Sequence, residues 1–108
     1  MKLKLPSPIE TYIHSSNESD LNGVLSCFTE TATVLDEGQT LSGHNAIGKW
    51  FTKTRSKYQF KSRPITIKDK DNTIIVTAEV SGNFPGSPIT LDYRFQIVSD
   101  LIQDLRIG

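Results

Sequence analysis

The sequence predicts an α+β fold in which helices pack on one face of an antiparallel sheet. In residues 8–57, apolar side chains recur mostly three and four positions apart, the period of a helix with one buried face. In residues 58–107, β-branched and aromatic residues alternate with polar ones, the period of a strand with one buried face. A helical half followed by hairpin-linked strands is typical of this fold class.

Three helices are predicted in the first half. The first covers residues 8–16 and follows Ser7, a residue type that favours a helix start when proline comes next. The second begins near Asp20, and its apolar stripe ends at Phe28. The third covers about residues 44–57, with its apolar residues again at helical spacing.

The predicted strands are short before the third helix and longer after it. Residues 31–36 and 39–42 form a hairpin around the turn Glu37-Gly38. Four further strands are predicted, separated by turn and loop residues: 65–68, 73–81, 89–98 and 101–107. In the third of these, apolar and polar residues alternate: Leu91, Tyr93, Phe95 and Ile97 against Asp92, Arg94 and Gln96.

Length and composition exclude several classes of protein. A chain of 108 residues fits one domain, residues 1–108. Lys plus Arg and Asp plus Glu each total 12, so no net positive charge attracts nucleic acid, and we interpret the basic residues 53–63 as a solvated helix end. Cys27 is the only cysteine, which excludes an intrachain disulfide. The sequence has no apolar run that resembles a signal peptide or a membrane span. We therefore expect a cytoplasmic protein that is not membrane-bound.

Motifs along nearly the whole chain resemble the nuclear transport factor 2-like superfamily. The segment 28–38, FTETATVLDEG, is similar to the passage from the second helix into the first strand of that fold. The start of the third helix in that fold is similar to residues 41–47, LSGHNAI, together with Trp50. A hairpin of SnoaL-like members is similar to residues 82–88 together with residues 93–95. The resemblance implies a cone, in which a curved antiparallel sheet wraps around the three helices. It implies no single function, because the fold hosts isomerases, cyclases, dehydratases and binding modules.

Ketosteroid isomerase gives the sharpest comparison within this superfamily. That enzyme removes a proton beside a carbonyl with an aspartate, and stabilises the enolate with a tyrosine and a protonated carboxylic acid. Tyr12 matches the tyrosine and Asp36 matches the base, without a gap between them. Alignment on Arg94-Phe95 places Leu91 at the position of the protonated acid. Asp92 is one residue away, which turns it to the other face of the strand. The resemblance therefore implies a site that lacks one oxyanion donor.

Two classes of function follow. In the first, the chain is a small-molecule binding domain whose apolar cone pocket is lined by Phe28, Trp50, Leu91 and Phe95. In the second, it is an isomerase or lyase with Asp36 as base and Tyr12 as donor. Each catalytic candidate also has a structural interpretation, since Asp36 suits the turn that follows it and Tyr12 suits the buried face of a helix. The two histidines lack partners at metal-ligand spacing, so we expect neither a metal nor a cofactor.

A partner is expected from the superfamily resemblance. Its members commonly pair through the outer face of the sheet, and here that face carries Thr77, Glu79 and Arg94 among apolar residues. Glu79 and Arg94 fall on neighbouring strands, where we expect them to pair. The predicted assembly is a homodimer formed through the sheet.

Overall fold

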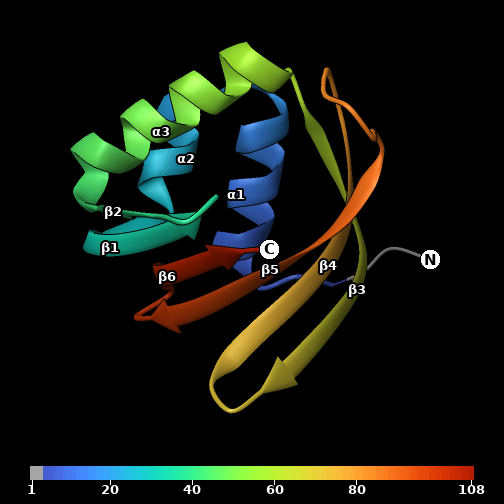
Figure 1. Cartoon of the computed structure of the whole chain (residues 1–108). Helices are drawn as coiled ribbons and strands as arrows, with labels where there is room; N and C mark the ends of the chain where they lie inside the picture. The colour runs from blue at the N-terminus through green and yellow to red at the C-terminus, as the bar shows by residue number, and fades with distance from the viewer. Residues whose placement is uncertain (1–3) are drawn as a thin grey trace.

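The computed structural model describes residues 4–108, so the first three residues of the predicted domain lie outside the described part. Helices lead, and most of the sheet follows in the second half of the chain (Figure 1). The elements are α1 (Ser7–Asn17), α2 (Leu21–Ser26), β1 (Phe28–Asp36), β2 (Gln39–Ser42), α3 (Gly43–Tyr58), β3 (Lys61–Lys70), β4 (Thr73–Ser81), β5 (Ile89–Val98) and β6 (Leu101–Ile107). The predicted order of elements is confirmed.

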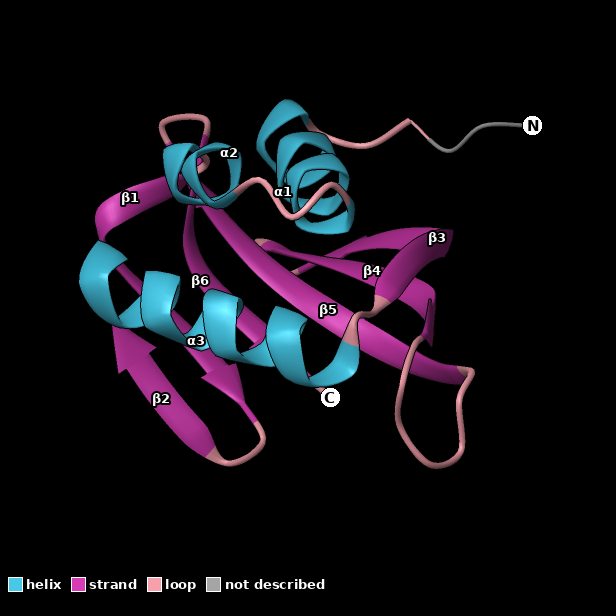
Figure 2. Ribbon diagram, turned by 90° about the horizontal axis from the view of Figure 1, so that it is seen from above, coloured by secondary structure: helices cyan, strands magenta, loops and turns pink. Residues whose placement is uncertain are grey.

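One six-stranded sheet, with the order β2-β1-β6-β5-β4-β3, wraps around the helices. Seen from above, the three helices lie over the same face of this sheet (Figure 2). Strands β3 to β6 form the predicted antiparallel meander. The expectation of a wholly antiparallel sheet was wrong at one pair, because β1 runs parallel to β6. A parallel pair needs a long crossover, which α3 and the meander between β1 and β6 supply.

Short two-residue turns set the register of the sheet. Residues 37–38, 71–72 and 99–100 each have two consecutive positive φ angles, between 51° and 76°. Turns of this handedness match the right-handed twist of the strands that they join, and Asn, Asp and Gly suit them. The four-residue turn expected at 69–72 is therefore shorter, because β3 continues to Lys70.

The second helix is shorter than predicted and does not include Phe28. Asp20 caps α2, accepting a hydrogen bond from the Gly23 amide at 3.1 Å, and the helix ends at Ser26. Gly23 allows α1 and α2 to approach, since a Cβ there would lie 2.4 Å from the Ser15 hydroxyl oxygen. Phe28 is instead the first residue of β1. The threonines that follow it are β-branched and favour an extended chain.

Alternation along the meander gives the sheet one apolar face. In β5, Tyr93 and Phe95 are buried, whereas Arg94 and Gln96 are exposed. The predicted ion pair between Glu79 and Arg94 was wrong: the register aligns Glu79 with Thr90 on β5 and with Arg63 on β3. Glu79 therefore pairs with Arg63 at 3.2 Å, and Arg94 contacts Asp92 on its own strand at 3.5 Å. No helix within residues 4–108 is long and apolar enough to cross a membrane.

Candidate functional site

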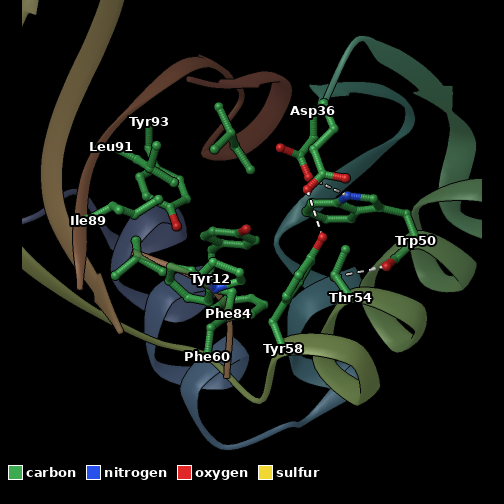
Figure 3. A pocket seen from close by; sticks show the side chains of 14 residues that line it. Tyr12, Asp36, Trp50, Thr54, Tyr58, Phe60, Phe84, Ile89, Leu91 and Tyr93 are labelled. Carbon is green, nitrogen blue, oxygen red and sulfur yellow. Dashed lines mark hydrogen bonds between the residues drawn. The ribbon is translucent and has the colours of Figure 1, made fainter. Parts of the chain in front are cut away.

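A cavity of about 280 Å³ lies between the sheet and the C-terminal half of α3, beside the loop of residues 82–88 (Figure 3). Its lining comes from most of the elements: Tyr12, Asp36, Glu37, Trp50, Thr54, Tyr58, Phe60, Val80, Phe84, Pro85, Ile89, Leu91, Tyr93 and Ile107. All three tyrosines and the single tryptophan of the chain are among these residues. The cavity is therefore an aromatic chamber with a few polar tips.

Asp36 lies at the end of β1, where the strand reaches the cavity. Its Oδ2 accepts a hydrogen bond from the indole Nε1 of Trp50 at 2.9 Å. Burial raises the pKa of Asp36 above its ordinary value of 3.8; the Trp50 hydrogen bond opposes this rise, and the charge of Glu37 adds to it. The hydrogen bond from Trp50 ties the carboxyl group to α3, and burial makes the group more basic than an exposed aspartate.

Two phenols face the same cavity from the opposite side (Figure 3). Tyr12 comes from α1, and burial raises its pKa well above 10.0, so its hydroxyl stays protonated at neutral pH. Tyr93 comes from β5, and its hydroxyl lies 3.1 Å from the Ser62 hydroxyl. Among the described residues, the Tyr12 hydroxyl has no hydrogen-bond partner. Of the two phenols, Tyr12 thus has the donor that a ligand can use.

Trp50 and Leu91 line this cavity, but Phe28 and Phe95 do not. Both rings pack behind Tyr12, with ring centroids at 5.8 and 5.9 Å from the Tyr12 ring and in edge-on geometry. They are 2% and 0% exposed, so the expected lining is replaced there by solid core. Tyr12 is thus the lining residue that contacts both of these rings.

Sequence reasoning missed the rim of the cavity, which α3 and the loop 82–88 form together. The Tyr58 hydroxyl donates to Glu37 Oε1 at 3.2 Å, and its ring meets Phe84 edge-on at 5.9 Å. The amide of Asn83 donates to the Tyr58 carbonyl at 2.6 Å, which ties the loop to the helix end. One signal was available, because Tyr58 follows Trp50 by two helical steps of four and so lies on the same face.

His44, at the start of α3, lies outside this lining. Its Nε2 is 3.0 Å from the Phe28 carbonyl oxygen, a contact that fastens α3 to β1. Within residues 4–108, no group of three or more His, Cys, Asp or Glu is arranged to hold a metal ion.

The helical half followed by a curved sheet gives the chain a cone-shaped α+β fold that is similar to the ketosteroid isomerase-like fold. The chain belongs to the SnoaL-like domain family, whose model matches residues 9–104. The predicted superfamily resemblance is confirmed.

Solved structures agree with this family. A proposed polyketide cyclase from Sinorhizobium meliloti is 32% identical, with a TM-score of 0.93; the match covers 96% of this chain and 95% of that one. A second structure is a protein of ketosteroid isomerase-like fold from Catenulispora acidiphila in complex with trimethylamine. It is 14% identical to this chain, with a TM-score of 0.84, and the match covers 97% of this chain and 86% of that one. TerC, co-crystallised with polyporic acid, is 14% identical, with a TM-score of 0.77 and coverage of 94% and 87%. No curated protein matches the chain.

Proposed function

We propose that this protein binds a small, largely apolar molecule in the cavity. The observation that carries the proposal is the gathering of the chain's only tryptophan and all three tyrosines around one space of about 280 Å³. Ligand pockets are mostly apolar with a few directed polar groups, and typically hold about 300–1,000 Å³. This cavity is near the lower end, which favours a ligand of one or two rings. Trimethylamine and polyporic acid in the two distant relatives support small-molecule binding by this fold.

Trp50 provides a direct test because it is the only tryptophan and is part of the wall. Titration with 2-naphthol, a neutral two-ring phenol, is expected to change the fluorescence of Trp50 and to saturate. Leu91→Phe narrows the cavity and should weaken binding by about tenfold or more. The matched variant Ile65→Phe, at a site that is 42% exposed and outside the lining, should leave the affinity unchanged. An unsaturable signal, or equal affinity in both variants, would contradict the proposal.

A second candidate function is proton abstraction beside a carbonyl. One observation supports it: Asp36 and Tyr12 both line the same cavity. Asp36 would take a proton from the carbon beside the carbonyl, and the electron pair of that C–H bond would move onto the carbonyl oxygen. Tyr12 would donate a hydrogen bond to the resulting enolate. Return of the proton to another carbon completes an isomerisation, whereas loss of a leaving group completes an elimination.

Deuterium exchange tests this step without knowledge of the substrate. Cyclohexanone in D₂O should exchange its protons next to the carbonyl faster with the protein than without it, as followed by NMR. Asp36→Asn should reduce this rate by about 100-fold or more while leaving 2-naphthol binding intact. Asp92→Asn makes the same chemical change on the other face of β5 and is the matched control. Equal exchange by the two variants would remove Asp36 from the mechanism.

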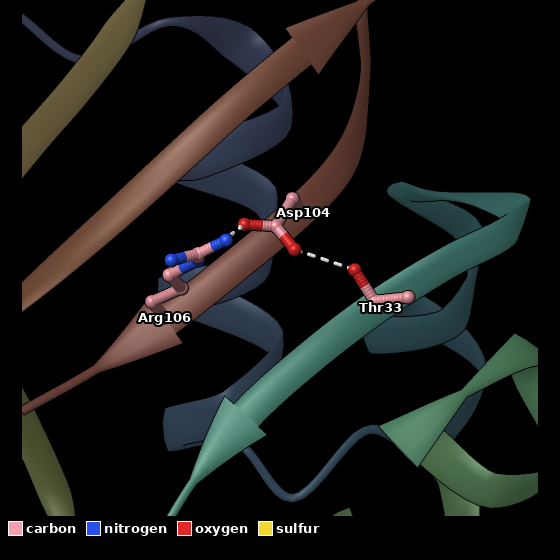
Figure 4. Close-up of polar contacts among 3 residues, drawn as sticks. All are labelled: Thr33, Asp104 and Arg106. Carbon is pink, nitrogen blue, oxygen red and sulfur yellow. Dashed lines mark hydrogen bonds and ion pairs between the residues drawn. The ribbon is translucent and has the colours of Figure 1, made fainter. Parts of the chain in front are cut away.

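We also propose that two copies pair through the outer face of the sheet. Polar side chains there contact one another: Thr33 on β1 donates to Asp104 Oδ1 on β6 at 2.5 Å, and Arg106, also on β6, contacts Asp104 Oδ2 at 3.2 Å (Figure 4). These contacts partly neutralise the charges on the face, which supports its burial against a second copy. Light scattering should give twice the mass of 12.0 kDa at micromolar concentration. A monomer mass there would contradict the proposal.

A further inference from the structure

The charge of the cavity points to a class of ligand. Its lining contains two carboxylates, Asp36 and Glu37, and no Lys, Arg or His among the described residues. Two cations contact rings of the lining: Arg55 lies 4.9 Å from the centre of the Phe60 ring, and Lys57 lies 5.0 Å from that of Tyr58. Neither cation is part of the lining.

The two carboxylates differ in how their charge is balanced. Glu37 is exposed, accepts from the Tyr58 hydroxyl and lies near the charge of Lys57. Asp36 is half-buried, and its polar contacts are the Trp50 indole N–H and the Glu37 backbone N–H, which are both neutral. A carboxylate removed from water without a counter-charge is costly, and its attraction for a cation rises as water is excluded. Asp36 is therefore the group in this cavity with the most to gain from a positive ligand.

The rings around Asp36 favour the same charge. The face of an aromatic ring carries partial negative charge, and rings of tyrosine and tryptophan attract ammonium groups within about 6 Å. Tyr12, Trp50, Phe84 and Tyr93 line the cavity, whereas Arg55 lies over the ring of Phe60 and Lys57 over that of Tyr58. Acidic and aromatic groups together make a surface that repels anions and accommodates alkylated ammonium groups.

We propose that the cavity takes a small organic cation, an alkyl- or arylammonium compound, with its charged nitrogen beside Asp36 and its carbon groups against the rings of Trp50, Tyr12 and Tyr93. The inference rests on the proposed function, since it names the class of ligand for the same cavity. It narrows that function, because an apolar pocket without a charge preference would bind a neutral molecule of the same shape equally well.

Isothermal titration calorimetry with two pairs of probes tests the charge preference. The first pair is choline and its neutral counterpart 3,3-dimethylbutan-1-ol, and the second is benzylamine and benzyl alcohol. At neutral pH and low salt, the cation of at least one pair is expected to bind about tenfold or more tightly than its neutral partner. In NMR titrations, bound cation should also lower the pKa of Asp36, whereas the neutral partner should not.

Variants at Asp36 assign the preference to that side chain. Asp36→Asn keeps an acceptor for Trp50 and should cost the cation about tenfold in affinity while changing neutral binding by less than about twofold. Asp92→Asn, which removes the same charge from the other face of β5, should change neither. Circular dichroism melting curves exclude variants that do not fold.

The remaining outcomes overturn the proposal in distinguishable ways. Equal affinity within each pair, or tighter binding of the neutral partner, would refute the cation while leaving small-molecule binding intact. A cation preference that survives Asp36→Asn would refute the role of Asp36. If neither pair binds while 2-naphthol does, the ligand class is wrong and the binding function stands. If no probe binds at all, both proposals fall.

Discussion

The core has two regions: one is densely packed, and the other borders the cavity and holds every tyrosine and the tryptophan together with Phe60 and Phe84. The packed region holds Ile9, Val24, Phe28, Ile47 and Phe95, all at most 2% exposed. The hollow region holds Tyr12, Trp50, Leu91 and Tyr93 around the cavity. Phenylalanine and aliphatic side chains have no polar atoms and fill space densely, whereas Tyr and Trp carry a polar tip that needs a partner. All of the aromatic side chains with polar tips border the cavity, the site proposed for a ligand.

The largest expected difference between the two regions is in how much free energy of unfolding is lost when an aromatic ring is removed. Phe95→Ala in the packed region should lower the free energy of unfolding by about 3–5 kcal/mol, because the cavity left behind is enclosed on every side. Phe84→Ala in the loop beside the hollow region should cost about 1 kcal/mol, since Phe84 is half-buried and already borders open space. Urea denaturation measures both. Similar costs would mean that the two regions are equally packed.

A smaller contrast is expected between the two phenols of the hollow region. Tyr93→Phe removes the partner of the buried Ser62 hydroxyl and should lower the free energy of unfolding by about 1 kcal/mol. Tyr12→Phe removes a hydroxyl with no partner among the described residues. This change should alter the free energy of unfolding by less than about 0.5 kcal/mol. Thermal melts of the two variants under identical conditions make the comparison. A larger loss for Tyr12→Phe would show that its hydroxyl supports the fold rather than a ligand.

The smallest expected effect is a change in pH dependence. Because burial raises the pKa of Asp36 in the folded protein, the folded state binds this proton more tightly than the unfolded state does. Its favourable contribution is fully present below the ordinary value of 3.8 and is lost as pH rises through the folded pKa. Asp36→Asn should remove that decline and leave the variant at least as stable as the wild type at neutral pH. Urea titrations at a series of pH values from 4 to 7 test this, and a steeper decline in the variant would contradict the sign.

Periodicity and turn chemistry determined most of the fold. The alternation in residues 89–98 correctly separated Tyr93 and Phe95 from Arg94 and Gln96, because a strand has only two faces. The same rule placed Leu91 toward the cavity and Asp92 away from it. Local patterns predicted the boundary between a helix and a strand less well. The apolar spacing up to Phe28 suits either element, but Phe28 belongs to the strand because the residues that follow it are β-branched.

The sequence likewise predicted only part of the candidate site, and the tertiary structure determined the rest. The helical spacing in the sequence predicted that Tyr12 and Trp50 lie on the inner side of their helices, and the family resemblance, with the turn alternative left open for Asp36, proposed Asp36 and Leu91 as their neighbours. Only the tertiary structure decided which inward residues border space and which fill it, so that Phe28 and Phe95 are packed while Tyr58 and Phe84 line the cavity. The physical reason is that a repeat in sequence fixes the face on which a side chain lies. Whether that face meets a neighbour or a void depends on how far apart α3, the loop of residues 82–88 and the sheet are held, and contacts distant in the chain set those separations.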